Sequence, residues 1–149
     1  MDIVKNNLGT CPVARALDRV GDSWSMLILR DAGRGFTRYD QFRTSLGIAP
    51  NILSRRLKAL TEAGLLAKRR YHERPPRDEY VLTEAGRDFL PVLHVLGEWS
   101  RRHHGGGVSS LVDAETGARV EPVVVDRATG RLLADRALRL VLPDHLLGT

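Results

Sequence analysis

Five stretches of the chain place apolar residues three or four positions apart, which is the spacing of an amphipathic helix. Proline at the first helical position and capping side chains mark their starts: Pro12 and Pro50 begin two of them, and Asp22 and Thr83 precede two others. We expect helices over residues 12–20, 23–31, 38–45, 50–63 and 84–104.

The pattern changes between the fourth and fifth helices. Residues 65–71 and 78–82 are compatible with β-strands, and Pro75 and Pro76 lie between them. Proline cannot donate to a strand ladder, so the prolines are expected at the tip of a hairpin, flanked by Arg74 and Arg77. A basic hairpin after a helix is the arrangement called a wing.

The fourth helix has two chemically opposed faces. At about 100° per residue, Leu53, Leu57 and Leu60 share one side, whereas polar residues occupy the other. Arg56 lies beyond the edge of the polar side, and its alternative role is to support packing or to form a salt bridge instead of belonging to that side. A short connection containing Gly47 joins the third helix to the fourth, as in a helix-turn-helix. The polar side suits the major groove of B-DNA.

Charge supports this interpretation. The chain has 149 residues, with 42% hydrophobic and 28% charged residues and a net charge of +5, which is typical of a globular protein. Residues 34–77 hold eleven basic and three acidic residues, a net charge of +8, whereas residues 105–149 have a net charge of −1. The positive charge is concentrated around the fourth helix and the hairpin.

We therefore expect the protein to bind double-stranded DNA in a sequence-specific way. Arg55 is the best candidate for reading a base, because arginine pairs with guanine through two hydrogen bonds. The alternative is a winged-helix module that binds proteins and does not recognise a DNA sequence. The candidate DNA-binding residues are Arg38, Asn51, Ser54, Arg55, Lys58, Arg74 and Arg77.

Other function classes find little support. The sequence has no nucleophile elbow, phosphate-binding glycine loop or metal-ligand cluster, so we expect neither an enzyme nor a bound cofactor or metal. Adjacent His103 and His104 do not share a helix face and are expected to be solvated. No apolar run approaches the length of a membrane span, and the start lacks a signal-peptide core. We expect a cytoplasmic protein without a membrane partner.

Residues 105–149 differ from the rest of the chain. Three glycines form a linker, and the pattern of residues 112–117 recurs at 125–130, each copy with Thr-Gly in a turn. We expect a mainly α protein with little β structure. Residues 1–104 would form a winged helix-turn-helix and dimerisation domain, and residues 105–149 a linker and a small β-hairpin appendage.

A series of short motifs follows the order found in one family of regulators: residues 11–12, 21–24, 27–29, 38–42, 47–48, 53–57, 64–65, 75–83, 86, 91 and 99. In these motifs the chain resembles the HxlR branch of bacterial winged-helix regulators, which are related to the MarR group. The resemblance implies a homodimer that binds an inverted-repeat operator and pairs through its first and last helices. The candidate dimer-interface residues are Val13, Leu17, Phe89, Leu93, Leu96 and Trp99.

The chain departs from the family pattern in two places. Ala49 stands where relatives usually have a capping serine or threonine, and losing that cap costs about 1 kcal/mol. Some relatives also carry a zinc-ribbon-like C-terminal segment with paired cysteines. Gly117 and Gly130 resemble its turns, but the cysteines are absent, so no zinc is expected.

Cys11 has two interpretations. It is a small apolar residue of a dimer interface, or it is a thiol switch activated by its place at a helix N-terminus. Several HxlR-type regulators sense electrophiles or oxidants through a cysteine at this location, so the resemblance makes Cys11 a candidate sensor. A small-molecule effector that binds without modifying the thiol is a further candidate partner.

Overall fold

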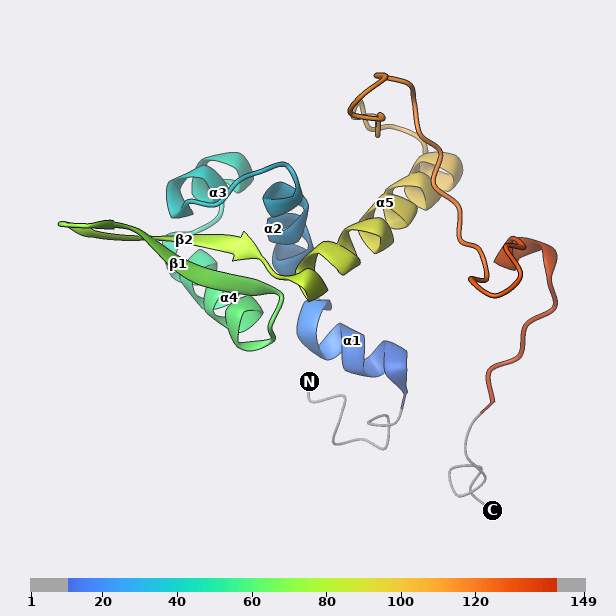
Figure 1. Cartoon of the computed structure of the whole chain (residues 1–149), viewed down its shortest axis with the longest axis horizontal. Helices are drawn as coiled ribbons and strands as arrows, with labels where there is room; N and C mark the ends of the chain where they lie inside the picture. Colours follow the sequence, from blue (N-terminus) through green and yellow to red (C-terminus); the bar gives the residue numbers. More distant parts are fainter. Residues whose placement is uncertain (1–10, 142–149) are drawn as a thin grey trace, which may run out of the picture. The chain divides into compact units, whose positions relative to one another are not determined.

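The computed structural model describes residues 11–141 and divides into two compact units, one up to Leu93 and one from His94 onwards. The first unit is a winged helix-turn-helix, as expected from the sequence (Figure 1). The second contains the C-terminal half of the last helix and the appendage. The elements are α1 (Pro12–Val20), α2 (Ser23–Gly33), α3 (Tyr39–Leu46), α4 (Pro50–Glu62), β1 (Leu66–Glu73), β2 (Pro76–Leu82), α5 (Glu84–His104) and a 3₁₀ turn (Leu133–Asp135).

Local signals set the helix ends. The Asp22 carboxylate accepts a hydrogen bond from the Ser25 N–H at 2.8 Å, which caps α2 as predicted. Gly47 ends α3 in the left-handed conformation with φ of 59°, which glycine adopts without strain. α4 begins at Pro50 after Ala49, which contributes no side-chain cap. The differences from the predicted bounds are one or two residues.

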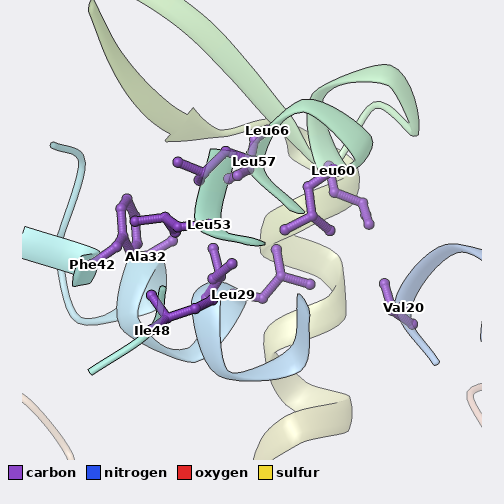
Figure 2. Close-up of a cluster of buried hydrophobic side chains, with 11 residues drawn as sticks. Val20, Leu29, Ala32, Phe42, Ile48, Leu53, Leu57, Leu60 and Leu66 are labelled. Atoms are coloured by element: carbon purple, nitrogen blue, oxygen red, sulfur yellow. The ribbon is translucent and has the colours of Figure 1, made fainter. Parts of the chain in front are cut away.

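A leucine ridge holds α4 against the rest of the first unit. Leu53, Leu57 and Leu60 are fully buried and face Leu29 on α2 and Phe42 on α3 (Figure 2). Each fully buried leucine contributes about 1.5–3 kcal/mol through removal of its side chain from water. Because this ridge fixes the rotation of α4, the opposite side of the helix must face solvent.

A buried carboxylate joins α2 to α3. The Asp31 side chain is fully buried, and the Ser45 hydroxyl donates a hydrogen bond to it at 2.6 Å. The guanidinium groups of Arg30 and Arg34 donate to the other carboxylate oxygen at 3.0 and 3.1 Å. A buried charge is tolerated when it is paired and hydrogen-bonded in this way. The cluster therefore fixes the position of α3 before the turn to α4.

The wing is longer than the sequence pattern indicated. β1 and β2 pair antiparallel from Leu66↔Leu82 to Glu73↔Pro76, and the ribbon runs out beyond α3 and α4 (Figure 1). The expected six-residue tip was wrong, because the turn contains Arg74 and Pro75 alone. Pro76 is the first residue of β2, and a strand tolerates proline at this position although proline has no N–H to donate to the ladder.

Gly86 allows α5 to start close to the wing. The Thr83 hydroxyl accepts from the Gly86 N–H at 3.1 Å, which confirms the predicted cap, and donates to the Gly64 carbonyl at 2.6 Å. A Cβ at Gly86 would overlap the Leu65 carbonyl. The first turn of α5 therefore packs directly on the backbone that leads into β1.

The appendage contains two similar turns. In the first, Asp113 accepts hydrogen bonds from two backbone N–H groups and from the Thr116 hydroxyl, and Asp126 and Thr129 make a related set 13 residues later. Each turn is closed by one isolated bridge, Val112↔Arg119 or Val125↔Leu132. The predicted hairpins are thus present as single bridges rather than as strands.

Within residues 11–141, no helix has both the length and the apolar character needed to cross a membrane.

Candidate nucleic-acid interface

The outward side of α4 carries unoccupied polar groups. Asn51, Ser54 and Arg55 are exposed, and their side chains make no hydrogen bond or ion pair within residues 11–141. Lys58 lies 3.9 Å from Glu62, but both side chains are mostly exposed, so this pair contributes little. The four predicted contact residues of α4 are therefore free to bind a ligand.

Arg56 has a structural position. Its side chain is half-buried, and its Nε lies 3.4 Å from Oδ1 of Asp22. The sequence placed Arg56 beyond the polar side of the helix, with a salt bridge as one alternative, and the structure contains that salt bridge. It links α4 to the start of α2.

Acidic residues of β2 neutralise the cations of β1. Arg69 donates two hydrogen bonds to Oε1 of Glu79, at 2.9 and 2.6 Å. Arg70 donates to Asp78 at 3.1 Å, and the Lys68 ammonium lies 3.5 Å from the same carboxylate. The charge count over residues 34–77 stopped just before these two acids. Opposite charges across the predicted hairpin were the signal that could have identified the pairs.

The free positive charge of the wing lies at its tip. Arg74 and Arg77 are exposed and make no ion pair within the described part of the chain. The turn between the strands is closed by a contact of 2.9 Å between Nδ1 of His72 and the carbonyl oxygen of Pro75. Both arginines are therefore available to an anionic partner, and their contact with DNA stays a prediction.

Arg38 lies between the helix-turn-helix and the wing. Its guanidinium carbon is 4.5 Å from the centroid of the Tyr71 ring on β1. Arg38 was predicted from the sequence pattern, whereas Tyr71 was not, because the contact joins residues far apart in the chain. Together, α4, Arg38 and the wing tip supply one polar and cationic set of side chains from three segments of the first unit.

Acid should loosen the wing. The hydrogen bonds from Arg69 hold the pKa of Glu79 below its ordinary value of 4.5, and the hydrogen bond from Arg70 lowers the pKa of Asp78 below 3.8. Depressed carboxyl pKa values stabilise the fold above the unfolded-state pKa, and the contribution is lost as the pH falls through the folded-state pKa. We expect the melting temperature to fall below about pH 4.5 and the Glu79→Gln variant to show a shallower fall.

The comparison needs melting curves between pH 2.5 and 6. Asp18→Asn is the matched control, since Asp18 is exposed on α1 and makes no ion pair within residues 11–141. An equally steep fall in the Glu79→Gln variant would show that the Arg69–Glu79 pair is not the cause.

The predicted interface residues differ in exposure. On α1, Val13 and Leu17 are 66% and 44% exposed. On the C-terminal half of α5, Leu96 and Trp99 are 45% and 53% exposed. Two further members of the predicted set, Phe89 and Leu93, are instead half-buried against the core of their own chain.

Cys11 immediately precedes α1. Its backbone is extended, its side chain is half-buried, and the thiol makes no capping hydrogen bond. Within the described residues, no group of three or more histidine, cysteine, aspartate or glutamate side chains is arranged to hold a metal ion.

These elements define a winged helix-turn-helix of the kind found in DNA-binding regulators. The profile of the HxlR-like helix-turn-helix family matches residues 19–106, and the chain belongs to this family. An uncharacterized HTH-type transcriptional regulator of Mycobacterium tuberculosis is 47% identical over 87 residues. That alignment covers 58% of this chain and 55% of the relative, so the chain matches about half the length of this curated protein.

Two solved structures extend the comparison. The crystal structure of PA1607, described as a transcription factor, has a TM-score of 0.78 and 36% identity, and the match covers 91% of this chain and 97% of PA1607. The oxidized form of the redox regulator HypR has a TM-score of 0.58 and 32% identity, covering 63% of this chain and 98% of HypR. The match to PA1607 thus reaches beyond residues 19–106 into the second unit.

Proposed function

We propose that the protein is a transcriptional regulator that binds an inverted-repeat operator as a homodimer. The observation that carries the proposal is the unoccupied polar side of α4, which lies opposite a fully buried leucine ridge. A helix of this width enters the major groove, where asparagine, serine and arginine can bond base edges. The relatives named as HTH-type transcriptional regulators support the same function.

The wing supplies the second part of the interface. Arg74 and Arg77 at its tip, with Arg38 beside Tyr71 of β1, are suited to phosphates or to an adjacent minor groove. Lys58 at the far end of α4 is a further phosphate contact. In this arrangement Arg55 reads bases, and the other cations fix the register of the protein on the duplex.

A second copy of the chain is the proposed partner for the exposed apolar residues of the terminal helices. Val13 and Leu17 on α1, and Leu96 and Trp99 on α5, leave large apolar side chains in water. Covering such side chains is the main source of stability in subunit interfaces. An inverted-repeat operator follows from the two-fold symmetry of a dimer.

Titration with duplex DNA at several salt concentrations tests the proposal. If each subunit neutralises about four phosphates, the logarithm of the affinity should fall with the logarithm of the salt concentration with a slope of about −7. The measurement is fluorescence anisotropy with labelled duplex, combined with sedimentation to establish the oligomeric state.

A slope near zero would contradict the DNA-binding proposal and would favour the alternative of a protein-interaction module. A steep slope without preference for any sequence would support phosphate binding but contradict the recognition of a specific operator. If the protein is monomeric at the concentrations at which it binds DNA, the proposed inverted-repeat operator is wrong.

We also propose that Cys11 regulates DNA binding through covalent modification. The thiol sits at the N-terminus of α1 and is half-buried rather than sealed in the core, so a small electrophile can reach it. The similarity to HypR, a redox regulator, supports this role. The reaction is addition of the thiolate sulfur to an electrophilic carbon of a quinone, with the proton passing to the reduced ring.

Treatment with a quinone is expected to weaken operator binding several-fold, and the Cys11→Ser variant should keep its affinity. Binding is measured by anisotropy before and after treatment, and adduct formation by the mass of the intact protein. If Cys11→Ser releases DNA to the same extent as the unsubstituted protein, Cys11 is not the sensor. The thiol would then be a packing residue of the α1 interface.

A further inference from the structure

Arg38 and Tyr71 form a contact between the helix-turn-helix and the wing. Arg38 immediately precedes α3, and Tyr71 lies in β1. The guanidinium carbon is 4.5 Å from the centre of the phenol ring, within the range of a cation–π interaction. Both side chains are exposed, so the pair lies at the surface between the helix-turn-helix and the wing.

The backbone around the pair is fixed. The Tyr80 N–H on β2 donates to the Thr37 carbonyl at 2.7 Å, which joins the segment before α3 to the wing. The Gln41 side chain accepts from the Thr37 and Arg38 N–H groups at 3.0 Å. The base of the Arg38 side chain is therefore held in place, and only its long stem needs to be ordered.

The strand register gives Tyr71 a distinct position. Arg70 pairs with Asp78 and His72 pairs with Arg77, so Tyr71 has no Cα partner on β2 and forms a bulge. Bulges re-aim a side chain and are common next to functional sites. The ring therefore belongs to the wing but contacts the helix-turn-helix.

The contact leaves the guanidinium donors free. The guanidinium carbon lies over the ring, and the five N–H donors of the group lie in its own plane around the edge. Within residues 11–141, the Arg38 guanidinium makes no hydrogen bond or ion pair that would occupy its donors, although its charge acts on the Glu79 carboxylate from a greater distance. An oriented guanidinium with free edges is suited to bind a phosphate through two parallel hydrogen bonds.

We propose that Tyr71 is a positioning residue for Arg38, which it holds so that the guanidinium edge meets a phosphate of bound duplex DNA. This inference rests on the proposed DNA-binding function. It assigns to the wing a second role besides the contacts of its tip, since the Tyr71 ring on β1 orders a cation of the helix-turn-helix.

A double-mutant cycle tests the proposal with the full-length protein and duplex DNA that carries its selected operator. Tyr71→Leu is expected to weaken binding about two- to fivefold per half-site, which is the range of an exposed cation–π contact. In the Arg38→Ala background, the same substitution should have no effect, because the residue that it positions is absent. Tyr71→Phe keeps the ring and should bind within twofold of the unsubstituted protein.

Arg43→Ala provides the matched background. Arg43 is an exposed arginine of α3 with no aromatic or acidic partner within the described residues. Tyr71→Leu should weaken binding in this background as much as in the unsubstituted protein. Melting temperatures of all variants report any loss of folding.

Equal weakening by Tyr71→Leu in the presence and absence of Arg38 would overturn the inference and indicate a purely structural role for the wing residue. A Tyr71→Phe variant as weak as Tyr71→Leu would also overturn it, since the ring would not be the active feature. If the unsubstituted protein binds no duplex, the proposed function itself fails. If the protein binds duplex DNA but the effects of Tyr71→Leu and Arg38→Ala are additive, only the positioning role of Tyr71 is overturned.

Discussion

Replacing Arg55 with alanine is expected to weaken operator binding by roughly 5- to 150-fold per half-site and to relax the preference for one base pair. The estimate corresponds to the 1–3 kcal/mol that a two-hydrogen-bond pairing of arginine with guanine contributes to discrimination. Arg55 is exposed on α4, and its side chain has no partner within residues 11–141. No internal contact is therefore lost with it, and the folding stability should not change.

The experiment compares Arg55→Ala with Lys58→Ala on a panel of duplexes that differ at single positions of the operator. Lys58→Ala should weaken all sequences similarly and reduce the salt slope by about one per subunit, because a phosphate contact carries no sequence information. Arg127→Ala, an exposed substitution in the appendage, is the control for a lost positive charge. If Arg55→Ala lowers the affinity for every duplex of the panel equally, Arg55 binds a phosphate and does not recognise a base.

Replacing Gly86 with alanine is expected to destabilise the protein by about 1–3 kcal/mol, the range for overpacking a well-packed region. The added Cβ would overlap the Leu65 carbonyl oxygen, and the Leu82 side chain is also close. The carbonyl belongs to the backbone that leads into β1, so it cannot move without shifting the wing. We expect this substitution to weaken DNA binding as well, through the changed position of the wing.

Gly97→Ala is the matched control on the same helix. Apart from the backbone of α5 itself, no atom of residues 11–141 lies within 4 Å of the position where its Cβ would be built. Alanine has the better helix propensity by about 1 kcal/mol, so this variant should be more stable than the unsubstituted protein. Chemical denaturation of both variants measures the two opposite effects. Similar stabilities for the two would show that the start of α5 can move away from Leu65 at little cost.

The helices could be predicted because their signals are local. Pro50 fixes the start of α4, Gly64 ends it in a left-handed conformation with φ of 78°, and three leucines on one side indicate the buried face. The exposed positions of Asn51, Ser54 and Arg55 follow from the same periodicity. This part of the candidate interface was therefore accessible from the sequence.

The limits of the wing were harder to predict. Paired prolines suggested a broad tip, but strand pairing continues up to Glu73 and Pro76 on either side of a two-residue turn. Proline is excluded from the middle of a strand ladder but is tolerated at the first residue of a strand. The pairing partners of Arg69 and Arg70 depend on this register, which the sequence pattern did not specify.

The class of fold, the polar side of α4 and the basic residues near it follow from local signals in the amino-acid sequence, because helix periodicity and capping act over a few residues. The folded chain was needed to establish which cations are available to a partner. Arg69 is paired with Glu79 and Arg56 with Asp22, whereas the Arg38 guanidinium carbon lies over the Tyr71 ring and its donors are not paired within residues 11–141. These contacts join residues brought together by chain packing, and local sequence patterns carry no information about distances across the fold.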